Sequence, residues 1–232
     1  QPQVDMQSRQ VLAGEVFVRW RHPRRGLMTP SSFLALAEQT GVIYPLTQWV
    51  LREAVAMIAT LEKARLVSKI AVNISSKDLL QDELVESLEF LFDKHKVKPA
   101  QLMLEIKEGA LAGSADKALS TIQRLHRMGV ELALDDFGTG LSSLAYLRRL
   151  PVQYVKVDCS FINDLHKSDM HSAITGAIID MARNLELGVI AEGVEEVEVE
   201  QKLLRMGCHR GQGFLYSRPF ELSGFAVWLK QW

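Results

Sequence analysis

The sequence has few of the features that mark a specialised class of protein. Its only cysteines are Cys159 and Cys208, too few and too far apart for a disulfide framework or a thiolate metal site. We therefore expect both to be packing residues in a cytoplasmic protein, either free or as the cytoplasmic part of a membrane-anchored one.

Long apolar runs and a strong net charge are also missing. No apolar stretch approaches the roughly 20 residues that span a bilayer, and no signal peptide is visible, because residues 1–5 are polar. The formal net charge of −1 gives no global field to attract an anionic membrane. We accordingly expect no DNA or RNA partner.

The 232 residues, 47% of them hydrophobic, suit one α/β barrel. The chain lacks an initiator Met and begins within an apparent strand. We therefore expect residues 1–232 to be a single domain, cut from the C-terminal part of a longer multidomain signalling protein.

Short apolar runs alternate with longer amphipathic segments along the whole chain. The runs predict strands at 12–20, 70–74, 102–106, 130–134, 154–157, 188–191 and 211–214. Helical spacing and end signals predict helices at 30–41, 46–61, 82–94, 114–128, 170–185, 197–206 and 222–230. This alternation implies parallel pairing, and about eight units favour a closed (β/α)8-like barrel. An open doubly wound sheet is the alternative, because the alternation of strands and helices does not by itself show that the sheet closes into a barrel.

Polar residues recur at the strand ends, where they are costly to bury: Glu15, Asn73, Glu105, Asp135, Lys156, Glu192 and Gln212. In a barrel the carboxyl ends of the strands meet at one mouth, where active sites form. Several of these residues supply oxygen ligands, which suit Mg²⁺ or Mn²⁺ and not Zn²⁺. Two such ions would suit displacement at phosphorus. Lys156 would there hold or polarise an attacking water.

The most informative stretch is residues 135–140, Asp-Asp-Phe-Gly-Thr-Gly. Asp135 and Asp136 end an apolar strand, and the glycines after them allow a sharp turn. Asp136 would bridge to a second ion. An N-cap followed by a tight turn is the simpler reading of this stretch alone.

Structural explanations also exist for single members of this set. Asn73 could satisfy backbone groups at a strand end, and Glu105 could form a structural ion pair with Lys156. Glu192 could favour a helix N-terminus, Gln212 could be a buried hydrogen-bonding residue, and Arg19 could belong to a solvated basic patch. Independent coincidences on so many strands are less credible than one site.

Taken in order, these motifs resemble the EAL-domain family of cyclic di-GMP phosphodiesterases over essentially the whole chain. The matching stretches lie at 1–5, 15–23 (Glu-Val-Phe-Val-Arg-Trp-Arg-His-Pro), 72–75, 104–108, 135–143, 155–158, 191–195 and 212–214. The resemblance implies a modified TIM-like (β/α)8 barrel with one antiparallel strand. It further implies hydrolysis of cyclic di-GMP to linear 5'-pGpG by a two-metal, water-nucleophile mechanism.

The resemblance also implies roles for individual residues. The first Mg²⁺ or Mn²⁺ would be held by Glu15, Asn73, Glu105 and Asp135, and Asp135 and Asp136 would share the second. Ca²⁺ is expected to inhibit. Lys156 would contact the nucleophilic water, with Glu192, Glu15 and Asp135 completing the catalytic set. Glu108 would support the loop after Asp136, called loop 6. Substrate contacts are expected from Gln1, Phe17, Arg19, Asp158, Glu195 and Gln212.

Two departures from the family pattern bear on activity. Val16 and Phe17 replace the Ala-Leu of the name-giving motif, and Phe17 could stack on guanine or crowd it. Lys107 stands where Thr is usual, and it could pair with Glu108 or an Asp and compete with the second metal, or point away. The alternative function is therefore a weak or inactive cyclic di-GMP receptor. The resemblance also implies a homodimer and an upstream sensory or GGDEF-type domain.

Overall fold

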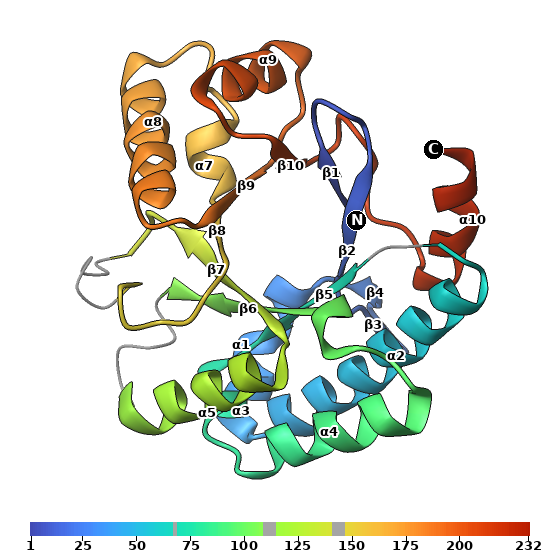
Figure 1. Ribbon diagram of the computed structural model, residues 1–232. Helices are drawn as coiled ribbons and strands as arrows, with labels where there is room; N and C mark the ends of the chain where they lie inside the picture. The colour runs from blue at the N-terminus through green and yellow to red at the C-terminus, as the bar shows by residue number, and fades with distance from the viewer. Residues whose placement is uncertain (67–68, 109–114, 141–146) are drawn as a thin grey trace.

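In the computed structural model, described for residues 1–66, 69–108, 115–140 and 147–232, eight strands close into a barrel. Figure 1 shows these strands ringing the centre of the molecule, with the helices outside them. Around the barrel the strands follow the order β1 (Pro2–Asp5), β10 (Arg210–Gln212), β9 (Gly188–Glu192), β8 (Tyr154–Val157), β7 (Glu131–Phe137), β6 (Leu102–Lys107), β5 (Lys69–Ile74) and β2 (Val11–Val16).

Strand β1 closes the barrel and is its antiparallel member. It pairs antiparallel with both β10 and β2, with Gln3 opposite Gln212 and Ala13, while the other neighbouring strands pair in parallel. The TIM-like barrel with one antiparallel strand is confirmed, and the open-sheet alternative is wrong. Closure brings the carboxyl ends of the parallel strands to one mouth.

Helices cover the barrel on its outside, as Figure 1 shows for α2, α4, α5 and α8. The α-helices are α1 (Leu34–Thr40), α2 (Ile43–Lys63), α3 (Ser76–Leu79), α4 (Glu83–His95), α5 (Ala115–Met128), α7 (Cys159–Ile162), α8 (Asp169–Asn184), α9 (Val197–Met206) and α10 (Phe225–Gln231). Short 3-10 turns span η1 (Pro30–Ser32), η2 (Pro99–Gln101) and η4 (Leu222–Gly224). The main core packs these helices against the outward-facing residues of the strands.

The strand expected at 12–20 is two separate elements. Strand β2 ends at Val16, where its pairing with β5 stops, and Trp20 begins β3 (Trp20–His22). Strand β3 forms a hairpin with β4 (Gly26–Met28), and Gly26, the first residue of β4, takes a positive φ of 70° where the chain leaves the turn. The apolar run gives no sign of this break, because β2 ends where its pairing with β5 stops and not where its hydrophobic residues end.

Other element boundaries shift by a few residues. The helix expected from Pro30 begins as a 3-10 turn and continues as α1, which Gly41 ends in the left-handed conformation as expected. The last strand covers 210–212 rather than 211–214. The expected helix start at Ser114 and the stretch 141–143 of the loop motif lie outside the described residues.

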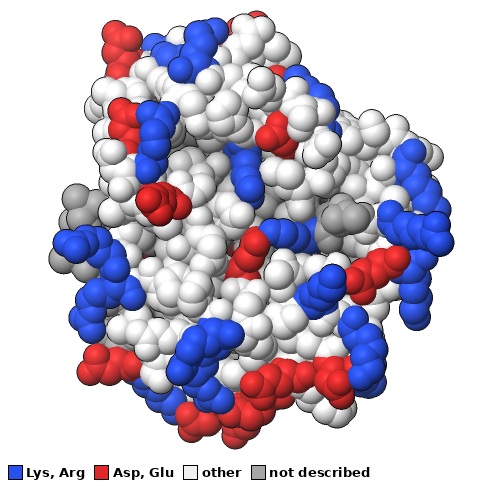
Figure 2. All heavy atoms as spheres, viewed as in Figure 1, with Lys and Arg blue, Asp and Glu red and all other residues white. Residues whose placement is uncertain are grey.

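Charged side chains of both signs are interspersed on the face seen in Figure 2, in keeping with the net charge of −1. Among the described helices, none has the length and apolar character needed to cross a bilayer.

Candidate functional site

A two-residue step along the strands places the site. An apolar layer inside the barrel contains Ala71, Met103, Ala133 and Ile190, with Tyr154 packed against it. Because side chains alternate faces along a strand, the residue two positions later points to the same interior. The site residues reached in this way are Asn73, Glu105, Asp135, Lys156 and Glu192. The apolar layer is thus the floor of a polar mouth.

Lys156 is the centre of this mouth. Its side chain has no exposed surface, and its Nζ lies within 3.1 Å of four carboxylates. The distances are 2.7 Å to Glu105 Oε2 and Glu192 Oε1, and 3.1 Å to Glu15 Oε2 and Asp135 Oδ1. The structure therefore brings these residues together, and the Glu105–Lys156 ion pair that the alternative explanation described is also present.

Three amides orient the carboxylates around Lys156. Asn73 Nδ2 donates to Glu15 Oε1 at 2.6 Å, and Gln212 Nε2 donates to Glu15 Oε2 at 2.9 Å. Gln3 Nε2 donates to Glu105 Oε1 at 3.0 Å and is itself buried. Sequence reasoning missed Gln3, although its place on the opening strand opposite Gln212 gives it the same interior direction.

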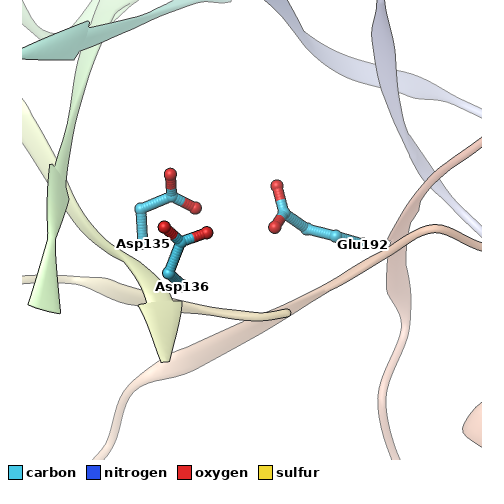
Figure 3. Close-up of side chains that lie close together, drawn as sticks. All are labelled: Asp135, Asp136 and Glu192. Atoms are coloured by element: carbon cyan, nitrogen blue, oxygen red, sulfur yellow. The ribbon is translucent and has the colours of Figure 1, made fainter. Parts of the chain in front are cut away.

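A second group of carboxylates lies beside this cluster. Asp135, Asp136 and Glu192 each offer an oxygen within 4.8 Å of the others, and Figure 3 shows the two aspartates from β7 facing Glu192 from β9. Lys107 Nζ, from the end of β6, donates to Asp136 Oδ2 at 2.6 Å. Lys107 shares the strand face of Glu105 two residues earlier, so the suggestion that it points away is wrong.

Glu108 holds the start of the loop after β7. Its Oε2 accepts a hydrogen bond from the Gly138 backbone N–H at 3.0 Å. Gly138 has a φ of 97°, a conformation that glycine adopts without strain. A Cβ at Gly140 would lie 3.1 Å from the Glu108 carboxylate. The carboxylate and this glycine turn therefore fit against each other.

Burial and crowding shift the pKa values of the cluster in different directions. Burial raises the pKa of Glu192 to about 7 and also raises that of Asp135, despite the opposing effect of Lys156. Burial and the Glu15 charge raise the pKa of Glu105 well above its usual range. Burial lowers the pKa of Lys156, but the carboxylates outweigh it and raise that pKa well above normal. Lys156 therefore stays protonated while Glu192 titrates near neutrality.

Two acceptor atoms in the mouth lack a hydrogen-bond donor among the described residues. They are Asp135 Oδ1, which lies 3.1 Å from Lys156 Nζ without an aligned hydrogen bond, and Gln212 Oε1. Five carboxylates face two ammonium groups here, so three negative charges are uncompensated when all are ionised. Orphaned oxygens with excess negative charge suit hard divalent cations.

The expected substrate residues are spread more widely. Gln1 accepts from Gln212 Nε2 at 3.2 Å, whereas Arg19 Nη1 donates to the backbone oxygens of Phe17 and Val18. Gln1, Phe17 and Arg19 line a cavity of about 410 Å³ that extends between α2, β2 and α10. Two further residues lie elsewhere. Asp158 accepts from Ser160 N–H and caps α7, and Glu195 is exposed.

Several of the simpler explanations can be judged from these contacts. Asn73 bonds Glu15, not the backbone, and Glu192 faces Lys156 at the end of β9, whereas α9 begins at Val197. Gln212 is the buried hydrogen-bonding residue that the simpler explanation described, and its hydrogen bond to Glu15 lies within the cluster.

Fold and site together define an α/β barrel with an acidic, lysine-centred mouth at the carboxyl ends of its strands. The EAL domain family matches residues 1–219, and the chain belongs to that family.

Relatives and solved structures agree with this assignment. MucR of Pseudomonas aeruginosa, named a bifunctional diguanylate cyclase/cyclic di-GMP phosphodiesterase, is 40% identical over 220 residues, covering 94% of this chain and 32% of MucR. The cyclic di-GMP phosphodiesterase NbdA of the same species is 41% identical over 233 residues, covering 99% of this chain and 30% of NbdA. The c-di-GMP complex of the PaMucR phosphodiesterase is 40% identical, with a TM-score of 0.89 over 95% of this chain and 90% of that one. The chain spans about a third of the length of the curated relatives it matches.

Proposed function

We propose that this chain hydrolyses one phosphodiester bond of cyclic di-GMP and releases linear 5'-pGpG. The observation that carries the proposal is the meeting of Glu15, Glu105, Asp135 and Glu192, from four strands, around the buried ammonium of Lys156. Relatives and a solved neighbour that share this family are named for the same substrate.

The oxygen-rich donor set supports Mg²⁺ or Mn²⁺ as the cofactor, with two ions per site. Glu15, Asn73, Glu105 and Asp135 would hold the first ion, and Asp135 and Asp136 would share the second. When bound, the ions would lower the pKa of a water and neutralise charge that develops on the phosphate.

The protein's own groups have distinct tasks in this proposal. Lys156, held protonated by its carboxylate neighbours, would orient the attacking water and stabilise the charge that forms beside it. Glu192, with a pKa near 7, is suited to take the water's proton at neutral pH. Asn73 and Gln212 would keep Glu15 in place through their hydrogen bonds.

Substrate binding would use the side of the mouth near β2. Phe17, with Gln1 beside it in the cavity, offers an aromatic face for a guanine base. Arg19 would turn its guanidinium to a substrate phosphate, a pairing that its fork geometry favours. Asp158, Glu195 and Gln212 are proposed as further polar contacts.

We also propose that the chain acts as a homodimer and as the C-terminal EAL part of a longer signalling protein with a sensory or GGDEF-type domain. The named diguanylate cyclase activity of MucR, and the third of each relative's length that the chain spans, support the second idea. Light scattering on the chain tests the first.

A receptor that binds cyclic di-GMP without cleaving it is the second candidate. One contact favours it, because Lys107 occupies Asp136, a proposed metal ligand, with its ammonium.

The deciding experiment measures pGpG formation from cyclic di-GMP in Mg²⁺ and in Mn²⁺, with binding measured in parallel in Ca²⁺, which we expect to block turnover. Glu15→Gln should abolish turnover, whereas Glu83→Gln, an equal change on the exposed side of α4, should leave it unchanged. Binding without turnover would identify the receptor instead. Wild-type turnover by Glu15→Gln would overturn the site assignment.

A further inference from the structure

Lys107 is a charged residue of the mouth that the proposed chemistry does not need. It ends β6 in register with Asp135 on β7, and its Nζ donates to Asp136 Oδ2 at 2.6 Å. The contact joins the ends of neighbouring strands at the rim of the barrel.

The Lys107 contact engages one of three carboxylates that could hold a cation together. Asp136 adopts a φ of 55°, in the left-handed region that a non-glycine residue rarely takes. Figure 3 shows its carboxylate beside that of Asp135, with Glu192 opposite. Asp136 Oδ2 already accepts a short, charge-assisted hydrogen bond. A divalent ion that uses this oxygen must therefore displace the ammonium.

The two lysines of the mouth differ in how easily they can leave. Lys156 is fully buried among four carboxylates, whereas the Lys107 side chain is 62% exposed and its Asp136 partner 32% exposed. Surface ion pairs of this kind contribute little, typically below about 1 kcal/mol. The Lys107 side chain can therefore move into solvent. Its ammonium competes with a divalent ion for Asp136 but does not prevent that ion from binding.

The charge balance of the mouth indicates which of the two ions competes with the Lys107 ammonium. Two divalent ions would more than neutralise the three uncompensated charges that remain beside Lys107 and Lys156. With all five carboxylates ionised, the first ion enters a site with three uncompensated negative charges. The second enters a site that is nearly neutral, and there it meets the Lys107 charge directly at Asp136.

We propose that Lys107 is a built-in competitor for the second divalent ion, which sets the ion concentration at which the site becomes fully loaded. Its ammonium occupies Asp136 when metal is scarce and leaves when the second ion binds. The inference rests on the proposed two-metal function of this site, and it concerns ion binding rather than turnover.

The test is Mn²⁺ binding without substrate, followed through the electron paramagnetic resonance signal of free Mn²⁺. Lys107→Met removes the charge and keeps most of the side chain's length, and Lys107→Thr provides a second variant should the first fail to fold. Lys107→Arg keeps the charge. Lys96→Met removes an equal charge from a surface pair with Asp93.

We expect the second Mn²⁺ to bind about two- to fivefold more tightly in both neutral variants, the range that corresponds to losing a surface ion pair worth up to about 1 kcal/mol. The first ion should change little, and the Arg and Lys96 variants should match the wild type. A wild type that binds one ion while Lys107→Met binds two would support the inference in its strongest form.

Equal second-ion affinity in the wild type and both neutral variants would overturn the inference, and so would a single ion in every protein. Neither result depends on hydrolysis. If the second ion tightens while pGpG never forms, the inference holds and the proposed catalytic function fails. If every Lys107 variant forms pGpG with the same dependence on Mn²⁺ concentration as the wild type, the proposed catalytic function holds and the inference about Lys107 fails.

Discussion

Lys156 carries the electrostatic balance of the mouth, because every carboxylate of the inner cluster depends on its single ammonium. Lys156→Met should therefore abolish turnover and also lower the free energy of unfolding of metal-free protein by about 3–5 kcal/mol, the usual cost of leaving buried charge unpaired. Urea denaturation in a chelating buffer measures this cost. Lys117→Met, which breaks an exposed pair with Asp82, should cost no more than about 1 kcal/mol. Equal stability of the two variants would contradict this account of Lys156.

Glu192 gives the metal-free protein a pH dependence of known sign. Burial, with help from Asp135 and Glu15, raises its pKa from 4.5 to about 7 against the pull of Lys156. Between those pH values the folded state therefore holds a proton that the unfolded state has lost, so the contribution of Glu192 to stability is fully present below pH 4.5 and is lost as the pH rises through 7. The contribution lost is on the order of 3 kcal/mol.

The Glu192 effect is isolated by comparing the wild type with Glu192→Gln in urea denaturation at pH 5 and pH 8, with chelator present. The wild type should lose more stability than the variant between these values. Parallel curves would show that Glu192 does not titrate in this range.

At the scale of the element, β6 supplies an interior residue, Glu105, and the residue directly after the strand, Glu108, supports the loop. Glu108→Ala removes the acceptor of the Gly138 N–H and frees the start of the loop that follows Asp136. Because small misplacements of catalytic groups are costly, we expect turnover to fall at least tenfold with little loss of stability. Hydrogen exchange at Gly138 should quicken in the same variant. Unchanged exchange with lost turnover would mean that Glu108 acts in some other way.

Much of the element-scale structure could be predicted from the sequence, because strand ends carry polar residues where apolar ones are expected. Lys156 and Glu192 each follow an apolar interior residue by two positions, and that step is visible in the sequence. The end of β2 at Val16 could not be predicted, because Phe17 and Val18 continue the apolar run. Only the end of pairing with β5 stops the strand there.

Gln3 illustrates the same limit within the site. It lies on a strand of only four residues, too short for a period to emerge, and its partner Glu105 is 102 positions away. The pairing of Lys107 with Asp136 instead of Glu108 likewise depended on contacts between neighbouring strands. In a long strand the sequence therefore predicts which side chains point into the barrel. Which of these side chains contact one another depends on how the barrel closes.

For the whole molecule, the mouth is the place where all the parallel strands and the antiparallel β1 meet, so an ion bound there would tie the barrel together. A ligand that binds only the folded state stabilises it by about 2.7 kcal/mol at 100 times its dissociation constant. For a chain of this size, that corresponds to a rise of roughly 5–10 °C in Tm. Mn²⁺ should produce this rise in the wild type, measured by thermal denaturation against a chelator baseline. The double variant Asp135→Asn, Asp136→Asn keeps the shape of the mouth but removes two ligand charges, so its Tm should respond weakly. An equal rise in both proteins would place the Mn²⁺ outside the mouth, and the two-metal proposal would lose its physical basis.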